Sequence, residues 1–316
     1  MDPVELRPSL MNAAAWTAAL AGHAAAMQQH WAYGAAAEAL GRRVLRCEVW
    51  QGGARLGLVQ MLERGPRAAP LRLILRGPVW TGPPPPARIQ RATLRVLGRG
   101  ATLATPEQPV AGAGLIPLIT PRHIARLDLT PPPAVLRAGL WGKWRNRLVV
   151  AEAAGVTVRQ EEGQPRDYRW LLAAEAAQRR ARGYRALPAG FVSVWAAAGG
   201  GLRLFTARDT PGGGPPLAAM LFLIHGDGAT YQIGWTGAEG RAAKAHNLIL
   251  WQALLALRAE GVRSLDLGDL NSEAAPGLVR FKLGCGAVPV ALGATCLVIP
   301  SVTLSRCGRG TQSPED

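Results

Sequence analysis

The sequence predicts an α/β (α+β) protein of two similar lobes, each a mostly antiparallel mixed sheet flanked by helices. Its 316 residues exceed the length of one typical domain. Each half contains alternating apolar segments followed by a helical pattern, and the triple proline Pro131–Pro133 lies between the halves. We therefore expect a first lobe over residues 1–133, a second lobe over 134–300 that carries the active site, and a disordered polar tail over 301–316.

Strand signals dominate the first lobe, because apolar and polar residues alternate over short segments. Three strands are expected, at Arg43–Trp50, Arg55–Leu62 and Leu71–Trp80. Gly52 and Gly53 indicate a hairpin between the first two strands, since glycine tolerates the positive φ of a tight turn. A helix at Ala87–Leu97 and a strand at His123–Leu129 are expected to complete the lobe.

The second lobe is expected to begin with one long amphipathic helix, Ala134–Ala154, whose apolar residues recur every four positions. The remaining pattern predicts, in order, strand Val156–Gln160, helices Tyr168–Arg182 and Leu187–Ala198, strands Leu202–Ala207, Leu217–His225 and Thr230–Trp235, helix His246–Ala259, strand Ser264–Leu267, helix Pro276–Leu283, and strands Val288–Leu292 and Thr295–Ile299. Antiparallel strands, a helical crossover and further strands are typical of the acetyltransferase, or GNAT, topology.

The formal net charge of +15 favours an anionic partner such as RNA, a nucleotide-linked sugar or a membrane surface. Among the 36 basic residues only Lys143, Lys244 and Lys282 are lysines, so part of this charge reflects a composition rich in arginine, alanine and glycine. Charge alone therefore does not choose among these partners.

Secretion, membrane insertion and metal chemistry are all disfavoured. No apolar run reaches spanning length, and the alanine-rich segment Met11–Met27 follows acidic residues where a secretory signal carries positive charge. The cysteines and histidines lack metal-ligand spacing, and no nucleophile elbow or phosphate-binding loop is found. We expect a cytoplasmic protein with no metal, no stable membrane span and reduced cysteines.

Five features of the second lobe occur in a fixed order on the expected strands and helices. They are Tyr231-Gln232-Ile233-Gly234, Leu248–Leu257, Gly261, Asp266-Leu267-Gly268 and Gly277-Leu278-Val279-Arg280-Phe281-Lys282. In this set the sequence resembles the Fem family, tandem-GNAT transferases that move amino acids from aminoacyl-tRNA onto peptidoglycan precursors. Weaker similarities lie at Gln29-His30-Trp31-Ala32-Tyr33 and Arg76-Gly77-Pro78-Val79. The resemblance spans about residues 25 to 295, a two-lobe length.

The resemblance implies two catalytic residues. Lys282 would place a positive charge against the oxyanion that develops at the transferred carbonyl, and Tyr231 would assist proton movement. From the residues alone, Phe281 is a packing residue and Lys282 a solvated cation favoured by the end of a helix.

The resemblance also implies substrate contacts at Phe281, Arg179, Arg180, Arg182, Tyr184, Asp266, Trp31 and Arg76. Arginine suits acceptor phosphates because its guanidinium group binds two oxygens at once, although a basic helix end facing water is the alternative for the first three arginines. For Asp266 the residues themselves favour a structural role at the strand end, because nothing nearby completes a metal site.

The loop before the helix at His246 bears on the donor. In a coenzyme A-dependent acetyltransferase this loop presents backbone N–H groups to the pyrophosphate, and glycine permits the close approach. Here Arg241 is in place but Lys244 replaces the glycine, which favours a donor other than coenzyme A; Lys244 could bind a phosphate itself, or the loop could be solvated. Gly34 and Ala35 stand where the family tends to carry a lysine, which disfavours a peptidoglycan nucleotide as the acceptor.

We therefore expect a transferase that moves an acyl or aminoacyl group from an activated ester, aminoacyl-tRNA in the leading hypothesis, to an amine on a peptide, a metabolite, a lipid-linked sugar or a wall precursor. No cofactor is expected, and tRNA is the expected macromolecular partner. A coenzyme A-dependent N-acyltransferase and a non-catalytic RNA- or polysaccharide-binding protein of the same fold stay open as alternatives.

Overall fold

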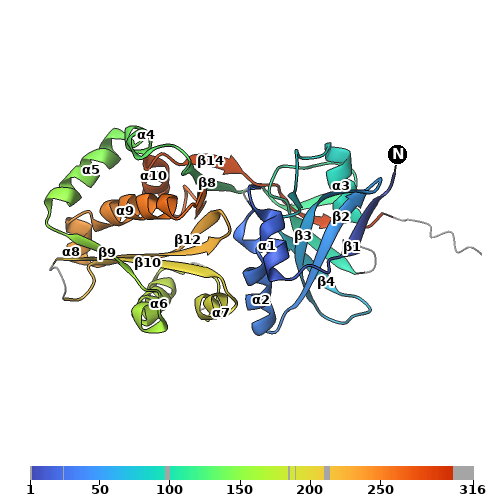
Figure 1. Ribbon diagram of the computed structural model, residues 1–316, viewed down its shortest axis with the longest axis horizontal. Coiled ribbons are helices and arrows are strands. Elements are labelled where there is room, and N and C mark those ends of the chain that lie inside the picture. The colour runs from blue at the N-terminus through green and yellow to red at the C-terminus, as the bar shows by residue number, and fades with distance from the viewer. Residues whose placement is uncertain are drawn as a thin grey trace, which may run out of the picture.

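The structure is a computed structural model that describes residues 2–23, 25–96, 100–183, 186–188, 190–209 and 214–301. An eight-stranded sheet and a seven-stranded sheet form the centres of two lobes (Figure 1). The expected two-lobe α/β architecture is therefore confirmed. The tail predicted to be disordered lies, beyond Ser301, outside the described residues.

The first sheet has the strand order β1-β2-β3-β4-β6-β15-β7, and β5 pairs with β3 at its side. Its strands are β1 Val4–Pro8, β2 Arg43–Gln51, β3 Ala54–Arg64, β4 Leu71–Leu75, β5 Val79–Trp80, β6 Ala101–Thr105, β7 Leu115–Ile119 and β15 Thr295–Val298. Its helices are α1 Ala13–Leu20, the 3-10 helix η1 Met27–Gln29, α2 Trp31–Ala39 and α3 Ala87–Arg95. Only β4 and β6 pair in parallel among these strands.

The second sheet has the strand order β9-β10-β11-β12-β13-β8-β14. Its strands are β8 His123–Asp128, β9 Thr157–Glu161, β10 Gly201–Arg208, β11 Ala218–His225, β12 Gly228–Thr236, β13 Ser264–Asp269 and β14 Val288–Ala291. Its helices are α4 Pro133–Ala138, α5 Gly142–Ala153, α6 Pro165–Arg182, α7 Phe191–Ala197, α8 Ala238–Ala242, α9 Ala245–Ala259 and α10 Pro276–Gly284. Here too one pair of described strands, β12 and β13, is parallel.

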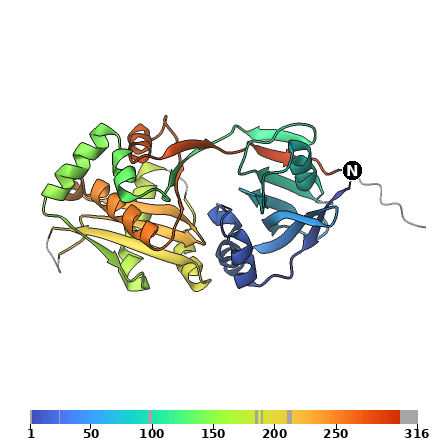
Figure 2. The ribbon, with the colours of Figure 1, turned by 45° about the horizontal axis from the view of Figure 1, so that its top comes forward.

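The two sheets have the same topology and exchange one strand each. Both run through four antiparallel strands, one parallel neighbour and two further antiparallel strands, with α3 and α9 before the fifth strand. The sixth position of the first sheet is β15, from the end of the chain, whereas the sixth position of the second sheet is β8, from the first half. The segments that lead to these strands cross side by side between the lobes, where the Leu292 N–H donates to the Arg122 carbonyl over 2.8 Å (Figure 2).

This exchange corrects the expected domain division. The boundary at Pro131–Pro133 assigns β8 to the first lobe and β15 to the second, and each pairs in the other sheet. Alternation of apolar residues shows that a segment is extended but carries no information about which sheet pairs with it. The duplication itself is visible in the shared strand order.

Two expected elements are interrupted. The predicted helix Ala134–Ala154 is two helices, because Trp141 between them is extended (ψ 144°) and its N–H donates to the Gly284 carbonyl over 3.0 Å. The predicted strand Leu71–Trp80 breaks at Arg76 (φ 56°) and the cis Gly77–Pro78 bond.

The strand β7 was not predicted. Its Leu-Ile-Pro-Leu-Ile sequence is tolerated because β7 lies at a sheet edge, where a proline removes no ladder hydrogen bond.

The core of the second lobe lies on both faces of its sheet. Along β11, Met220 and Phe222 face a cluster with α5 and α9, while Leu221 and Leu223 face a cluster with α6 and α7. Such two-sided burial explains why the strand reads as a continuous apolar run. The second cluster also includes Tyr33 of α2, so the two lobes share apolar packing (Figure 1).

Candidate functional site

A cavity of about 310 Å³ opens between the lobes, where two strands of the second sheet separate. β12 and β13 pair in parallel only from Gly228 with Ser264 to Thr230 with Asp266, and diverge beyond these residues. The lining of the cavity includes Gln28, Arg76, Thr230, Gln232, Gly268 and Asp269. Residues of both lobes and of both separated strands therefore meet at one hollow that can hold a small substrate group.

Lys282 lies directly behind this lining. It is on α10, only 5% exposed, and its Nζ donates to the Asp269 carbonyl over 2.8 Å. The ammonium group is also next to Gly268, since a Cβ placed on that glycine would be 3.7 Å from Nζ. Burial lowers the pKa of Lys282, and the carboxylates of Asp269 and Asp266 counteract part of this effect. The alternative of a solvated helix-end cation is therefore wrong, because the charge is buried beside the cavity.

Phe281 and Tyr231 pack against the core cluster on the face of the second sheet that α5 and α9 cover. The Phe281 ring is 6.0 Å from that of Trp144 and 6.2 Å from that of His246, as expected for a packing residue. Tyr231 packs on Phe222 at 5.7 Å, and its hydroxyl lies against Gly234. The cavity lining contains its neighbours Thr230 and Gln232 but not Tyr231.

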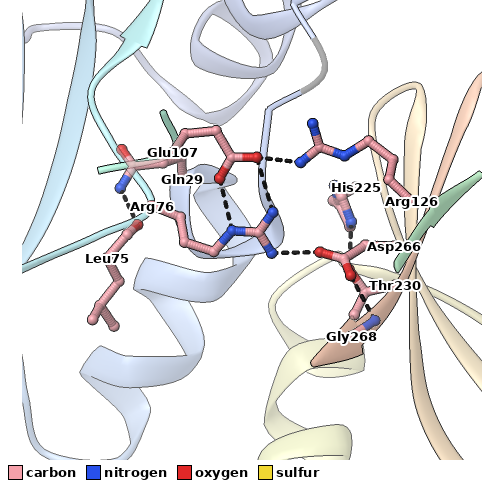
Figure 3. A network of polar contacts seen from close by, with 9 residues as sticks. All are labelled: Gln29, Leu75, Arg76, Glu107, Arg126, His225, Thr230, Asp266 and Gly268. Carbon is pink, nitrogen blue, oxygen red and sulfur yellow. Dashed lines mark hydrogen bonds and ion pairs between the residues drawn. The ribbon is translucent and has the colours of Figure 1, made fainter. Parts of the chain in front are cut away.

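An ion-pair network joins the lobes beside the cavity (Figure 3). Arg76 donates to both Glu107 oxygens, over 2.7 Å and 2.9 Å, and to Asp266 of the other lobe; Glu107 also binds Arg126. Asp266 accepts from the Gly268 N–H over 2.7 Å. Burial acts to lower the pKa of Arg76, but the hydrogen bonds and charges of Glu107 and Asp266 outweigh it and hold the pKa above its ordinary value.

This network changes the interpretation of two expected substrate contacts. Arg76 and Asp266 both line the cavity, but each neutralises the other across the lobe interface. Asp266 also fixes the loop at the end of β13, as the residues themselves had indicated. Both are therefore part of the framework that holds the cavity open at the strand divergence.

Two buried histidines, which sequence reasoning did not select, lie beside the network. The His225 Nε2 is 2.9 Å from the Thr230 Oγ1, and the His30 ring is 6.4 Å from that of His225. Burial lowers the pKa of His30 to about 4, while burial together with the nearby His30 lowers the pKa of His225 to about 3. Both imidazoles are therefore neutral at physiological pH. His30 lies in the segment Gln29-His30-Trp31-Ala32-Tyr33 that resembles the Fem family, but nothing in the sequence places it beside His225, so only the fold brings the two rings together.

These histidines predict a loss of stability in mild acid. The unfolded chain takes up protons near pH 6.5, whereas the folded protein resists protonation down to about 4 and 3. The unfolded state therefore binds more protons in this window, and the free energy of unfolding falls as pH decreases, by up to about 1.4 kcal/mol per pH unit for each histidine. Urea denaturation between pH 7 and 4.5 measures the slope. An equal slope in the His30→Gln, His225→Gln double variant would contradict the assignment.

Among the residues that the structure describes, the remaining candidate substrate contacts do not line the cavity beside Lys282. Trp31 packs inside the first lobe, with the Arg46 guanidinium group 3.8 Å above its ring. Arg180 is exposed on α6, and Arg179 donates to the carbonyl of Leu187, a residue of the cavity lining, over 3.1 Å. The side chain of Arg182 and all of Tyr184 lie outside the described residues.

The loop before α9 is a short helical turn. Lys244 has a positive φ of 55°, and Arg241 donates from its side chain to the Thr236 carbonyl over 2.8 Å. The N–H groups of Arg241, Ala243 and Lys244 bind carbonyls within this same segment. They are therefore already satisfied, whereas a pyrophosphate site needs free N–H groups.

Within the part of the chain that the structure describes, no helix is long and apolar enough to cross a membrane. The same residues contain no cluster of histidine, cysteine, aspartate and glutamate suited to a metal ion. The three described cysteines, Cys47, Cys285 and Cys296, are free.

Comparison with known protein families defines the class of this protein. Residues 143–282 match the family model of the acetyltransferase (GNAT) domain, a range that ends at Lys282 and includes β9 to β13. The second lobe is therefore a GNAT domain, and the expected class, an acyltransferase, is confirmed.

The fold of the whole chain is that of FemX. The crystal structure of FemX is 14% identical in sequence, with a TM-score of 0.72, over 90% of this chain and 96% of that chain. A protein of unknown function from Bacteroides thetaiotaomicron VPI-5482 is 11% identical, with a TM-score of 0.61, over 93% of this chain and 100% of that one. A search of curated proteins finds no match. The predicted resemblance to Fem proteins is thus confirmed in the fold of both lobes.

Proposed function

We propose that this protein transfers an aminoacyl or acyl group from an activated ester, aminoacyl-tRNA in the first instance, to an amine held in the cavity between the lobes. The observation that carries the proposal is the buried ammonium group of Lys282 beside Gly268, at the divergence of β12 and β13. A cation in a site of low dielectric stabilises developing negative charge more strongly than one in water.

In the proposed reaction the amine nitrogen attacks the ester carbonyl carbon. A C–N bond forms and the carbonyl π electrons move to oxygen, giving a tetrahedral oxyanion that Lys282 stabilises from behind Gly268. Collapse of this intermediate breaks the C–O bond to the donor, whose oxygen receives the proton that the amine loses. Assistance of this proton transfer by Tyr231 or by a substrate phosphate stays a prediction, as do the contacts of Phe281.

The donor loop favours an aminoacyl ester over coenzyme A. The N–H groups of Arg241, Ala243 and Lys244 bind carbonyls of the α8 turn, and Lys244 occupies the position where a glycine would permit a phosphate to approach the backbone. A tRNA donor instead needs surface cations that neutralise its phosphates. In this proposal these cations are Arg179, Arg180, Arg241 and Lys244. A tRNA donor also implies that the protein works in the cytoplasm. Coenzyme A stays the alternative donor.

Parallel assays with two donors test the function. The full-length protein is incubated with total aminoacyl-tRNA carrying radiolabelled amino acids and, separately, with radiolabelled acetyl-coenzyme A, each with a cell extract as the acceptor. We expect enzyme-dependent movement of label from tRNA into an amide product that resists mild base. Label loss from acetyl-coenzyme A alone would identify the alternative donor, and no transfer from either would refute the proposal.

Binding of tRNA is expected to weaken steeply with salt. Arginines that neutralise phosphates release counterions on association, so the logarithm of the binding constant falls with a slope of about −0.9 for each phosphate contacted in a duplex. Replacing Arg179 and Arg180 by alanine should reduce this slope by about 2. Filter binding between about 50 and 300 mM salt measures this slope, because phosphate contacts weaken over that range of salt. A flat salt dependence, or an unchanged slope in the double variant, would argue against this surface.

A further inference from the structure

The imidazole of His225 is held between the backbone of a tight turn and one hydroxyl group. His225 pairs with Gly228 across the hairpin that joins β11 to β12, and a Cβ on Gly228 would lie 2.9 Å from the His225 Nδ1. On its other side the ring meets the Thr230 hydroxyl, with 2.9 Å between Nε2 and Oγ1. The Nδ1 atom is buried and has no hydrogen-bond partner of ordinary geometry among the described residues; the main chain of His225 itself acts on the ring only weakly, as the smallest of the effects on its pKa.

This asymmetry distinguishes the two neutral forms of the ring. A proton on Nδ1 would bury a donor without a partner, whereas a proton on Nε2 leaves Nδ1 as an unsatisfied acceptor and gives the donor to Thr230. Among main-chain groups, orphaned buried N–H groups are rarer than under-satisfied carbonyl oxygens, and we apply the same preference to the ring nitrogens. The geometry therefore favours the Nε2–H form, in which His225 donates to the Thr230 oxygen.

The hydroxyl proton of Thr230 then points away from His225. Thr230 is only partly buried and lines the cavity between the lobes, whereas His225 lies on the other side, fully packed next to Arg76 and Asp266. Thr230 is also the last residue of β12 that pairs with β13; its partner Asp266 lies two positions before Gly268 on β13. The hydroxyl is thus at the divergence of the strands, on the same cavity that Lys282 borders from behind.

We propose that Thr230 is a second hydrogen-bond donor to the carbonyl oxygen of the transferred group, and that His225 is the positioning residue that orients it. This inference rests on the proposed function for its substrate and deepens it. Thr230 donates a hydrogen bond and gives up no proton, so the bonds made and broken in the transfer are unchanged. As negative charge develops on the carbonyl oxygen, the hydrogen bond shortens and stabilises the tetrahedral intermediate.

The first test is independent of turnover. Long-range ¹H–¹⁵N correlation spectra of protein with ¹⁵N-labelled histidine distinguish the neutral forms of each ring, and the His225 signals are identified by their loss in a His225→Phe variant. We expect a neutral His225 with its proton on Nε2. A proton on Nδ1 would overturn the inference whatever the activity, because Thr230 would then donate to the ring rather than to the cavity.

The second test uses isosteric variants in the two-donor assay. Thr230→Val keeps the volume but removes the hydroxyl, and is expected to lower kcat about 100-fold with KM little changed. Thr230→Ser should recover most of this loss. His225→Phe should lower kcat, and His225→Gln, whose amide nitrogen can stand in for Nε2–H, should recover part of it.

Thr93→Val is the matched control. Thr93 is buried on α3 and does not line the cavity, and its hydroxyl donates to the Ile89 carbonyl over 2.9 Å, so kcat should stay near the wild-type value. Equal losses in Thr93→Val and Thr230→Val, or near-normal kcat in Thr230→Val, would overturn the role of Thr230. A wild-type protein that transfers from neither donor would instead refute the proposed function, while the form of the His225 ring would still decide how Thr230 is oriented.

Discussion

Replacing Asp266 by alanine is expected to lower the free energy of unfolding by about 3 kcal/mol, because the change leaves a buried arginine with one carboxylate instead of two. The side chains of Asp266 and Arg76 are only 10% and 12% exposed, so neither charge is well solvated. Glu107 stays bound to Arg76 but is shared with Arg126, which leaves the remaining network with net positive charge. The variant also removes the acceptor for the Gly268 N–H.

Urea denaturation of matched variants separates these contributions. Asp266→Asn keeps an oxygen for the Gly268 N–H but loses the charge, so it should cost less than Asp266→Ala. Glu5→Ala removes a partner from the surface pair with Arg7, whose side chains are 52% and 50% exposed, and should cost less than about 1 kcal/mol. Equal costs for Glu5→Ala and Asp266→Ala would contradict a buried interlobe network.

The sequence predicts the strands and helices more reliably than their connections. Periodicity along β11 and α9 identifies those elements because each is packed on apolar neighbours. The same signal cannot show that β8 and β15 exchange sheets, since pairing is set by contacts between residues far apart in the chain. It also cannot show the break at Trp141, whose extended conformation depends on a hydrogen bond to Gly284.

The site was predictable where one residue is unusual in its own surroundings. Lys282 stands out because lysine is rare in this arginine-rich chain and follows Phe281 in a recognisable order of motifs. Arg76 and Asp266 were selected separately, but their pairing across 190 positions required the fold. The pairing of Thr230 with His225 had no signal in the sequence, although both residues flank the hairpin turn before Tyr231.

Lys282→Ala is expected to lower turnover by about 10²- to 10³-fold, the cost of removing one oxyanion donor. Folding should be little affected, because Lys282 donates to a main-chain carbonyl and not to a carboxylate. Burial of a cation without a bonded counter-charge is costly, so a purely structural role would favour an apolar residue of similar size. Lys282→Met should therefore fold at least as well as the wild type. Its turnover should be as low as that of Lys282→Ala.

Arginine is not expected to replace this lysine. The ammonium group fits one oxygen next to Gly268, whereas a planar guanidinium group needs more room at a position that is 5% exposed. Since burial lowers the pKa of Lys282, wild-type turnover should also decline on the alkaline side before the ordinary lysine value of 10.5 is reached, as the charged form is lost.

Single-turnover kinetics of the alanine, methionine and arginine variants measure these effects, with thermal melts as the folding control. Lys143→Ala, on the exposed face of α5, is the matched control and should behave as the wild type. Near-normal turnover in Lys282→Met would refute the oxyanion role, because that variant keeps the packing and removes only the charge.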